Sequence, residues 1–351
     1  MNAREEAGVV TTASVVESVL AAVRREVTGI LLDDIPDGDP PGLYDLVSAY
    51  PSRPGKSLRP ALCLATCEAL GGDPARAVNT AVAIELFHNG FLIHDDIQDQ
   101  SESRRGAPTL QADHGVSVAL NVGNATNLLG LQRLMRNRRA LGSELSWRIL
   151  QETELMLRHS LEGQAIELQW IRENVCDLVD DDYYRMCLKK TSWYTCVYPC
   201  RIGALVAKNG RVETAQFDRY GWYLGAAFQI QDDILNLVGD YDRYGKEIAG
   251  DLFEGKRTMM IIDLLRQATG ADRQRLEAFL AKSRAEREPD DVRWLLDRLI
   301  DEGCIDRAHQ RAQELARAAR VEAERAFAGA PPSQGLDFLL ALPDYMVERD
   351  R

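Results

Sequence analysis

The stretch RAVNTAVAIELFHNGFLIHDDI, residues 76–97, combines the two features that decide the fold of this chain. Its apolar side chains recur every three to four residues, which is the period of one face of an α-helix. Its last residues are acidic, so a helix with a largely apolar body ends in carboxylates. Residues 14–32, 147–168 and 307–327 share the helical period. Strand-like alternation is scarce, and we therefore predict an all-α fold.

The breaks between the helical segments are short. They fall at residues 35–41, 50–55, 71–74 and 330–333. Glycine, proline and aspartate in these breaks favour turns between helices. Because no long Gly/Ser-rich or Pro-rich tract divides the chain, we expect one all-α domain over residues 13–351, preceded by a disordered N-terminus at residues 1–12.

The composition narrows the functional classes. The chain has 351 residues, of which 45% are hydrophobic and 27% charged, as in a globular protein with a substantial core. Its net charge of −12 argues against nonspecific nucleic-acid binding, because that affinity comes from lysine and arginine neutralising phosphates. No apolar run approaches the roughly 18 residues that span a bilayer, and the N-terminus lacks the pattern of a signal peptide. We therefore expect a cytoplasmic protein without a membrane span or a nucleic-acid partner.

The seven cysteines are an odd number without a secretion signal, so disulfides are not implied. Cys63 and Cys67, like Cys196 and Cys200, are four residues apart and could hold a soft metal on one helix face. No further ligands cluster with either pair in the sequence. Small buried helix residues are therefore the favoured interpretation.

The first acidic motif is Asp95-Asp96-Ile97-Gln98-Asp99. Residues four apart lie about 40° apart around a helix axis, so Asp95 and Asp99 share a face while Asp96 points to the side. Carboxylates suit Mg²⁺, which takes one or two of them and completes its shell with water and substrate phosphate. The spacing predicts a diphosphate-bridged magnesium site, with a solvated acidic helix end as the alternative. Arg104 and Arg105 follow closely, and arginine's planar donor fork matches phosphate oxygens.

The second motif, Asp232-Asp233-Ile234-Leu235-Asn236, places Asp232 and Asn236 on one face. An amide is a neutral, weaker ligand, so we expect Asp232 to make the main metal contact and Asn236 to contact water or the edge of the metal.

Two basic segments accompany the acidic motifs. Lys56 and Arg59 are spaced to hold one phosphate group, and a second segment, from Tyr244 to Thr258, contains Lys246 and Lys256. Taken alone, either basic segment would more commonly be solvated surface.

Five segments in order resemble the all-trans prenyl diphosphate synthase family: GKSLRP (55–60), HNGFLIHDDIQDQSESRRGAPT (88–109), KKTSWYT (189–195), FQIQDDILNLVGD (228–240) and GKEIAGDLFEGKRT (245–258). The resemblance runs from about Leu43 to about Leu265. The closing segment GLDFLLALPDYMVERD (335–350) is similar to the end of geranylgeranyl diphosphate synthases. The chain departs from the family pattern at Ser57, where many members have a basic residue, and at Asn236, where they have aspartate.

The resemblance implies a single-domain bundle of antiparallel helices around a central cavity. It also implies a Mg²⁺-dependent prenyltransferase that condenses isopentenyl diphosphate head-to-tail with an allylic diphosphate. About three Mg²⁺ ions would bridge the allylic diphosphate between Asp95 and Asp99 on one side and Asp232 on the other. The resemblance also implies a homodimer.

The same resemblance assigns the remaining site residues. Those implied to hold the allylic diphosphate are Arg104, Lys190 and Lys246, with Lys256 as a further substrate-binding residue. Those implied to hold isopentenyl diphosphate are Lys56, Arg59, His88 and Arg105. Thr191 and Gln229 match positions near the allylic carbocation. We expect His94 to be structural, and Trp193, Tyr194 and Tyr198 to pack in the core, with a cavity-wall role as the alternative for the three aromatic residues.

Product length should depend on the residues below the first aspartate. Phe91, one turn before Asp95, could form a floor, while Gly90 leaves space beside it. The resemblance favours a C20 product, geranylgeranyl diphosphate, with farnesyl diphosphate or a C25 product as alternatives. Two other functions stay open: a class I terpene cyclase on the same scaffold, and a noncatalytic subunit that regulates an active synthase. Lys56, Arg59 and Arg105 argue against a cyclase, which has no second diphosphate to hold.

Overall fold

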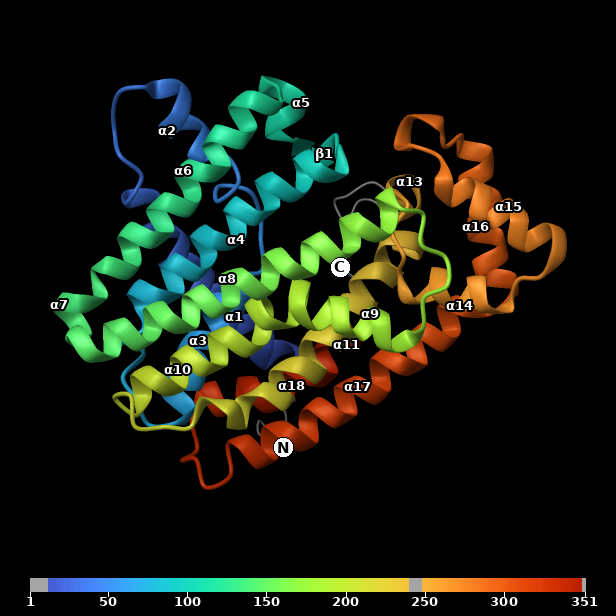
Figure 1. Cartoon of the computed structure of the whole chain (residues 1–351). Helices are drawn as coiled ribbons and strands as arrows, with labels where there is room; N and C mark the ends of the chain where they lie inside the picture. Colours follow the sequence, from blue (N-terminus) through green and yellow to red (C-terminus); the bar gives the residue numbers. More distant parts are fainter. Residues whose placement is uncertain (1–11, 240–247, 349–351) are drawn as a thin grey trace, which may run out of the picture.

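The computed structural model describes residues 12–239 and 248–348 (Figure 1). The helices before the second acidic motif are α1 (Thr12–Asp33), α2 (Pro41–Val47), α3 (Leu58–Ala69), η1 (Pro74–Arg76), α4 (Val78–Asp99), α5 (Leu110–His114), α6 (Val116–Met135), α7 (Asn137–Leu141), α8 (Ser143–Arg172), α9 (Asp180–Cys187), η2 (Leu188–Val197), α10 (Tyr198–Ala207) and η3 (Thr214–Phe217). The later helices are α11 (Asp218–Val238), α13 (Gly250–Glu254), α14 (Met259–Gln267), α15 (Gly270–Ala281), η4 (Arg284–Glu286), α16 (Pro289–Asp301), α17 (Cys304–Ala326) and α18 (Gln334–Glu348). The prediction of an all-α fold is confirmed.

The four segments with the clearest helical period form α1, α4, α8 and α17. Helix α1 begins at Thr12, the last residue of the predicted disordered segment, and the residues before it lie outside the described part of the chain. In the described chain the strands are β1 (Ser103–Arg104) and β2 (Ala107–Pro108), which pair Ser103 with Pro108 and Arg104 with Ala107. This hairpin directly follows α4, so it holds two arginines beside the first acidic motif.

The helices pack around the two that carry the acidic motifs. Helix α4 lies against α6, and α11 lies against α17 and η2, which also contacts α8. Buried apolar residues form two clusters, one drawn mainly from α1, α3, α4, α10 and α18, and the other from α9, α11, α14, α16 and α17. In Figure 1 the long helix α8 crosses the molecule, with α7 at one side and α15 and α16 at the other.

Element η2 is a π-helix, a wide helical form that is often found at functional sites. It lies close to α8 because Gly163 has no side chain, and a Cβ atom there would collide with the backbone of Lys190. The glycine therefore fixes the position from which Lys190 and Thr191 extend.

The cysteines are all free thiols, and all except Cys176 are buried. Burial raises the pKa of Cys67 to about 12, so this thiol stays protonated at neutral pH. Within the described residues, no group of three or more histidine, cysteine or acidic side chains is arranged as a protein-only metal site. The cysteine pairs thus pack in the core, as expected. No helix in the described ranges is long and apolar enough to cross a membrane.

Candidate active site

A cavity of about 1110 Å³ lies between α4, α8, η2 and α11 and is closed on one side by the β1–β2 hairpin. The predicted residues that line it are Lys56, Arg59, His88, Phe91, Asp95, Arg104, Arg105, Lys190, Thr191, Gln229, Asp232 and Lys256. A smaller cavity of about 270 Å³ adjoins it, and its lining includes Asp99 and Asn236. Lys246 lies outside the described residues.

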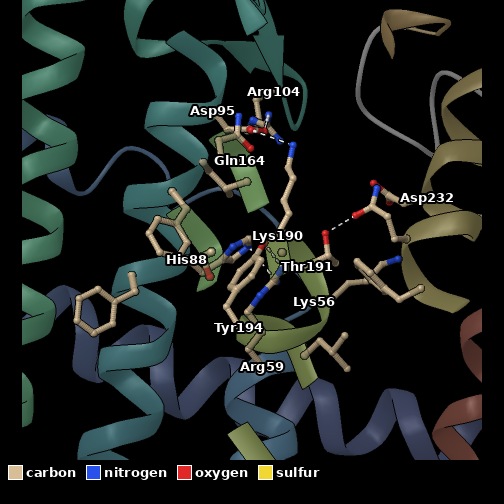
Figure 2. Close-up of a pocket in the computed structure, with 18 of the residues that line it drawn as sticks. Lys56, Arg59, His88, Asp95, Arg104, Gln164, Lys190, Thr191, Tyr194 and Asp232 are labelled. Atoms are coloured by element: carbon tan, nitrogen blue, oxygen red, sulfur yellow. Dashed lines mark hydrogen bonds and ion pairs between the residues drawn. The ribbon is translucent and has the colours of Figure 1, made fainter. Parts of the chain in front are cut away.

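The first acidic motif occupies the last turns of α4. Asp95 faces the large cavity with 28% of its side chain exposed, and its carboxylate lies 3.8 Å from both Arg104 and Lys190. Asp99 is buried, and its Oδ2 lies 2.9 Å from the Nζ of Lys256. Figure 2 shows Lys190 reaching from η2 toward Asp95 and Arg104. Asp95 and Asp99 therefore line the same smaller cavity, in keeping with the shared face that their spacing predicts.

Asp96 has a different environment from its two neighbours in the motif. Its side chain is 1% exposed, and one carboxylate oxygen accepts a hydrogen bond from the Nε of Arg104 at 2.6 Å and forms an ion pair with its Nη2 at 2.5 Å. The other oxygen accepts a hydrogen bond from the hydroxyl of Tyr50. Asp96 thus points to the side, as expected, and holds Arg104 in place.

The second motif repeats this division between exposed and buried aspartates. Both aspartates line the large cavity, but Asp232 is half-buried, whereas Asp233 is buried and accepts hydrogen bonds from the Tyr183 hydroxyl at 2.8 Å and the Gln229 amide at 2.7 Å. Burial raises the pKa of Asp233 well above its usual value, and the nearby carboxylate of Asp251 raises it further. Asp232 is therefore the residue of this motif placed to meet a ligand in the cavity.

Asn236 is buried and joins the motif to the next helix. Its side-chain oxygen accepts a hydrogen bond from the backbone N–H of Asp251 at 3.0 Å. Its backbone carbonyl oxygen accepts one from the backbone N–H of Ala249 at 2.7 Å. These contacts fix the start of α13. The metal contact expected of Asn236 stays a prediction.

Lys256 lies in a cluster of carboxylates. Its Nζ is 2.9 Å from Asp99, 3.2 Å from Asp251 and 2.5 Å from Glu254. Burial alone would lower the pKa of Lys256, but the surrounding carboxylates raise it well above its usual value. Burial and the neighbouring carboxylates raise the pKa of Glu254 to about 8, and a cation bound beside the cluster would favour its ionised form.

The residues present fit a diphosphate-bridged Mg²⁺ site. Both motifs lie at helix C-termini, where the helix dipole already favours cations, and neither α4 nor α11 has a basic residue in its last turn. Asp95, Asp99 and Asp232 are the side chains that would hold the ions.

Lys190 and Thr191 extend from the π-helix toward different partners. Lys190 is paired with Glu167 of α8 and also lies near Asp95. The hydroxyl of Thr191 donates to the Gln229 side chain at 2.7 Å, and Gln229 in turn donates to Asp233. The two residues predicted to lie near the carbocation are thus hydrogen-bonded to each other.

A second basic group lies below Asp95 and Arg104 in Figure 2. The guanidinium of Arg59 is 3.2 Å from the Nε2 of His88 and donates to the Tyr194 hydroxyl at 2.6 Å. Its Cζ also lies 4.3 Å from the centroid of the Tyr194 ring, within cation–π range. Tyr194 lines the cavity, which supports the cavity-wall alternative over simple core packing.

Lys56 and Arg105 complete this second group at the cavity wall. Ser57, which follows Lys56, has a left-handed backbone (φ 49°) that turns the chain into α3. Glu85 is buried behind the group: burial raises its pKa, and the positive charges of Arg59 and Arg105 partly offset that rise.

The expectation of free space beside Gly90 is wrong. A Cβ atom on Gly90 would collide with the side-chain amide of Asn127 in α6, and Gly90 is absent from the residues that line the described cavity. The glycine therefore permits close packing of α4 on α6. Phe91 does line the cavity, and its ring meets Tyr194 edge-on with centroids 5.5 Å apart.

The sequence profile of the polyprenyl synthetase family matches residues 40–299, well over half of the chain. The chain belongs to the polyprenyl synthetase family. A short chain isoprenyl diphosphate synthase of Methanothermobacter thermautotrophicus is 32% identical over 296 residues, covering 84% of this chain and 87% of that protein. A geranylgeranyl pyrophosphate synthase of Geoglobus acetivorans is 32% identical over 312 residues, covering 89% and 92%. The crystal structure of the geranylgeranyl pyrophosphate synthetase from Pyrococcus horikoshii matches with a TM-score of 0.81 at 31% identity, covering 95% of this chain and 99% of that chain.

The sequence alone did not single out several residues of this site. They are Tyr50, Glu85, Glu167, Asp251 and Glu254. Asp251 and Glu254 are spaced three apart and precede Lys256, a pattern that could have indicated an ion cluster on one helix face. Glu85 stands in an otherwise apolar helical stretch, and a lone carboxylate there predicts a buried cationic partner. Tyr50 and Glu167 have no such signal.

Proposed function

We propose that this polyprenyl synthetase condenses isopentenyl diphosphate head-to-tail with an allylic diphosphate, in a Mg²⁺-dependent reaction that releases diphosphate. One observation carries the proposal: two separate sets of cationic side chains line the same cavity. Arg104 and Lys190 accompany the acidic motifs, whereas Lys56, Arg59 and Arg105 stand apart from them. Two diphosphate esters can therefore be held at once.

The first step is ionisation of the allylic C–O bond. Bound Mg²⁺ would supply positive charge to the leaving diphosphate. Arg104 and Lys190 would donate hydrogen bonds to the same group, which stabilises charge that develops in the transition state. The aromatic faces of Phe91 and Tyr194 and the oxygens of Thr191 and Gln229 suit a neighbouring carbocation.

Carbon–carbon bond formation follows when the double bond of isopentenyl diphosphate attacks that cation. Lys56, Arg59, His88 and Arg105 would orient this second substrate, so that the reacting carbons meet without diffusing apart. A proton is then lost from the new cation to the departing diphosphate. No Ser-His-Asp or Cys-His arrangement is needed for these steps.

The product is proposed to be geranylgeranyl diphosphate (C20). The cavity of about 1110 Å³ exceeds the roughly 1,000 Å³ upper end of ordinary ligand pockets, as expected where two substrates and a long tail must fit. Several relatives are named geranylgeranyl diphosphate synthases, and a relative from Aeropyrum pernix is named a geranylfarnesyl diphosphate synthase. Measuring the chain length of the product will therefore decide between the C20 product and the farnesyl and C25 alternatives.

A homodimer in the cytoplasm is also part of the proposal. Helices α6 and α8 expose large apolar side chains, among them Leu128, Met135, Trp147 and Leu161. Exposed apolar side chains clustered on neighbouring helices are typical of a protein interface, and a second copy of the chain would cover them.

The deciding experiment incubates the purified chain with isopentenyl diphosphate and C5, C10 or C15 primers, with Mg²⁺ or with EDTA, and separates the products by chromatography. We expect a C20 product only with Mg²⁺. Termination at C15, or elongation well beyond C20, overturns the chain length alone. A hydrocarbon formed without isopentenyl diphosphate indicates a cyclase, and no product from any primer indicates a noncatalytic subunit.

A further inference from the structure

Two adjacent arginines, Arg104 and Arg105, are assigned to two different diphosphates. They occupy the end of β1 and the two-residue turn of the hairpin, where Arg105 and Gly106 both have positive φ angles of 53° and 75°. Such a turn is compact, and successive side chains in it point in different directions. Both arginines contact the segment 50–55, which precedes Lys56.

Tyr50 acts on Arg104 through Asp96. Tyr50 is fully buried, and its hydroxyl donates to one oxygen of Asp96, while the other oxygen accepts from Arg104. The arginine fork is thus fixed at two nitrogens by a carboxylate that is itself fixed by a tyrosine.

Arg53 ties the backbone of the hairpin to the same segment. Its Nη1 donates to the carbonyl of Arg104 at 3.0 Å and its Nη2 to the carbonyl of Pro108 at 2.7 Å. Its Cζ lies 4.7 Å from the centroid of the Tyr50 ring. Both strands are therefore held by one side chain.

Gly55 acts on Arg105 by direct contact. A Cβ atom on Gly55 would lie 3.0 Å from Nη1, 3.1 Å from Cζ and 3.2 Å from Nη2 of Arg105. The guanidinium therefore lies against bare backbone, and an added methyl group would push it away by a few tenths of an ångström.

We infer that the segment 50–55 sets the directions of the two arginines separately: Tyr50, through Asp96, positions Arg104 for the allylic diphosphate, and Gly55 positions Arg105 for isopentenyl diphosphate. The inference rests on the proposed condensation and deepens it. Tyr50 and Gly55 are positioning residues, because neither needs to touch substrate.

The test measures the KM of each substrate with the other saturating, for the full chain with Mg²⁺. Tyr50→Phe should raise the KM of the allylic diphosphate about tenfold, the effect of losing one hydrogen bond to a charged group, and leave the other KM within about twofold. Gly55→Ala should do the reverse, raising the KM of isopentenyl diphosphate about fivefold through a displaced guanidinium.

Matched controls separate positioning from general damage. Tyr220→Phe removes another buried tyrosine hydroxyl, which donates to the carbonyl of Leu339 at 3.0 Å. Gly29→Ala adds a methyl group where no neighbouring atom lies within 4 Å. Both controls should leave both KM values unchanged, whereas Arg53→Lys should raise both because it loosens the whole hairpin.

The outcomes distinguish the inference from the proposed function. A wild-type chain that does not condense the substrates overturns the function and the inference together. Normal wild-type turnover with unselective KM changes, or none, overturns the inference alone. If Tyr50→Phe does not fold, the selectivity of Gly55→Ala decides the question.

Discussion

The two acidic motifs share the letters DDI at the ends of α4 and α11, but their second aspartates have different partners. Both Asp96 and Asp233 are buried and accept a hydrogen bond from a tyrosine hydroxyl. Asp96 is also paired with the guanidinium of Arg104, whereas Asp233 also accepts a hydrogen bond from the neutral amide of Gln229. One is a buried ion pair, and the other is a carboxyl whose pKa burial raises well above its usual value.

The last residues of the motifs differ as well. Asp99 is paired with Lys256, while Asn236 accepts a hydrogen bond from the backbone of α13. The first aspartates, Asp95 and Asp232, are alike in a different way, since both are half-buried side chains that line the large cavity. The first position of the repeated motif thus has the same role in both copies, facing the ligand. The second and last positions have different partners in the two copies.

The largest expected effect tests the shared role. Asp95→Ala and Asp232→Ala should each lower kcat of Mg²⁺-dependent condensation by about a thousandfold or more, because each removes negative charge that would hold the cations. Steady-state assays across a Mg²⁺ titration measure this. Asp297→Ala, at an exposed position of α16, is the control. Near-normal turnover in both site variants would contradict the proposed mechanism.

The next effect tests the difference between Asp96 and Asp233. Asp96→Asn leaves buried Arg104 without its close carboxylate and should lower the free energy of unfolding by about 3 kcal/mol. Asp233→Asn keeps neutral hydrogen-bond partners and, at a pH low enough for Asp233 to hold its proton, should change it by no more than about 1 kcal/mol. Urea unfolding at one protein concentration measures both. Equal losses would show that the pairing with Arg104 does not distinguish the two sites.

A smaller effect concerns pH. Because burial raises the pKa of Asp233 in the folded chain, the stability it contributes is present below the usual carboxyl pKa of about 3.9 and is lost as the pH rises through the raised value. Asparagine does not titrate, so the Asp233→Asn variant does not lose this stability as the pH rises. The unfolding free energy of the variant minus that of wild type should therefore increase with pH. Unfolding in EDTA from pH 4 upward measures the difference. A flat difference would mean that Asp233 is not the group that titrates.

The sequence predicts the placement of the acidic residues on their helices. It does not predict the contacts that they make with distant parts of the chain, and the reasons can be identified. Helical period and spacing correctly placed α4, the face shared by Asp95 and Asp99, and the sideways direction of Asp96. The partners of Asp96 were not predictable, because Tyr50 reaches it across 46 positions of chain and no local spacing encodes that contact. The space beside Gly90 was predicted wrongly since it depends on Asn127, which belongs to another helix.

The smallest effect tests whether Asn236 has any role at the metal. Asn236→Asp supplies a charged ligand and should lower the Mg²⁺ concentration for half-maximal activity by about twofold to threefold, a gain limited by the carboxylate of Asp251 nearby. Asp99→Asn should raise the same concentration about tenfold. Asn209→Asp, at an exposed position, is the matched control. If Asn236→Asp leaves the Mg²⁺ curve unchanged while Asp99→Asn shifts it, Asn236 serves only to fix the start of α13, and the second motif binds metal through Asp232 without help from its last residue.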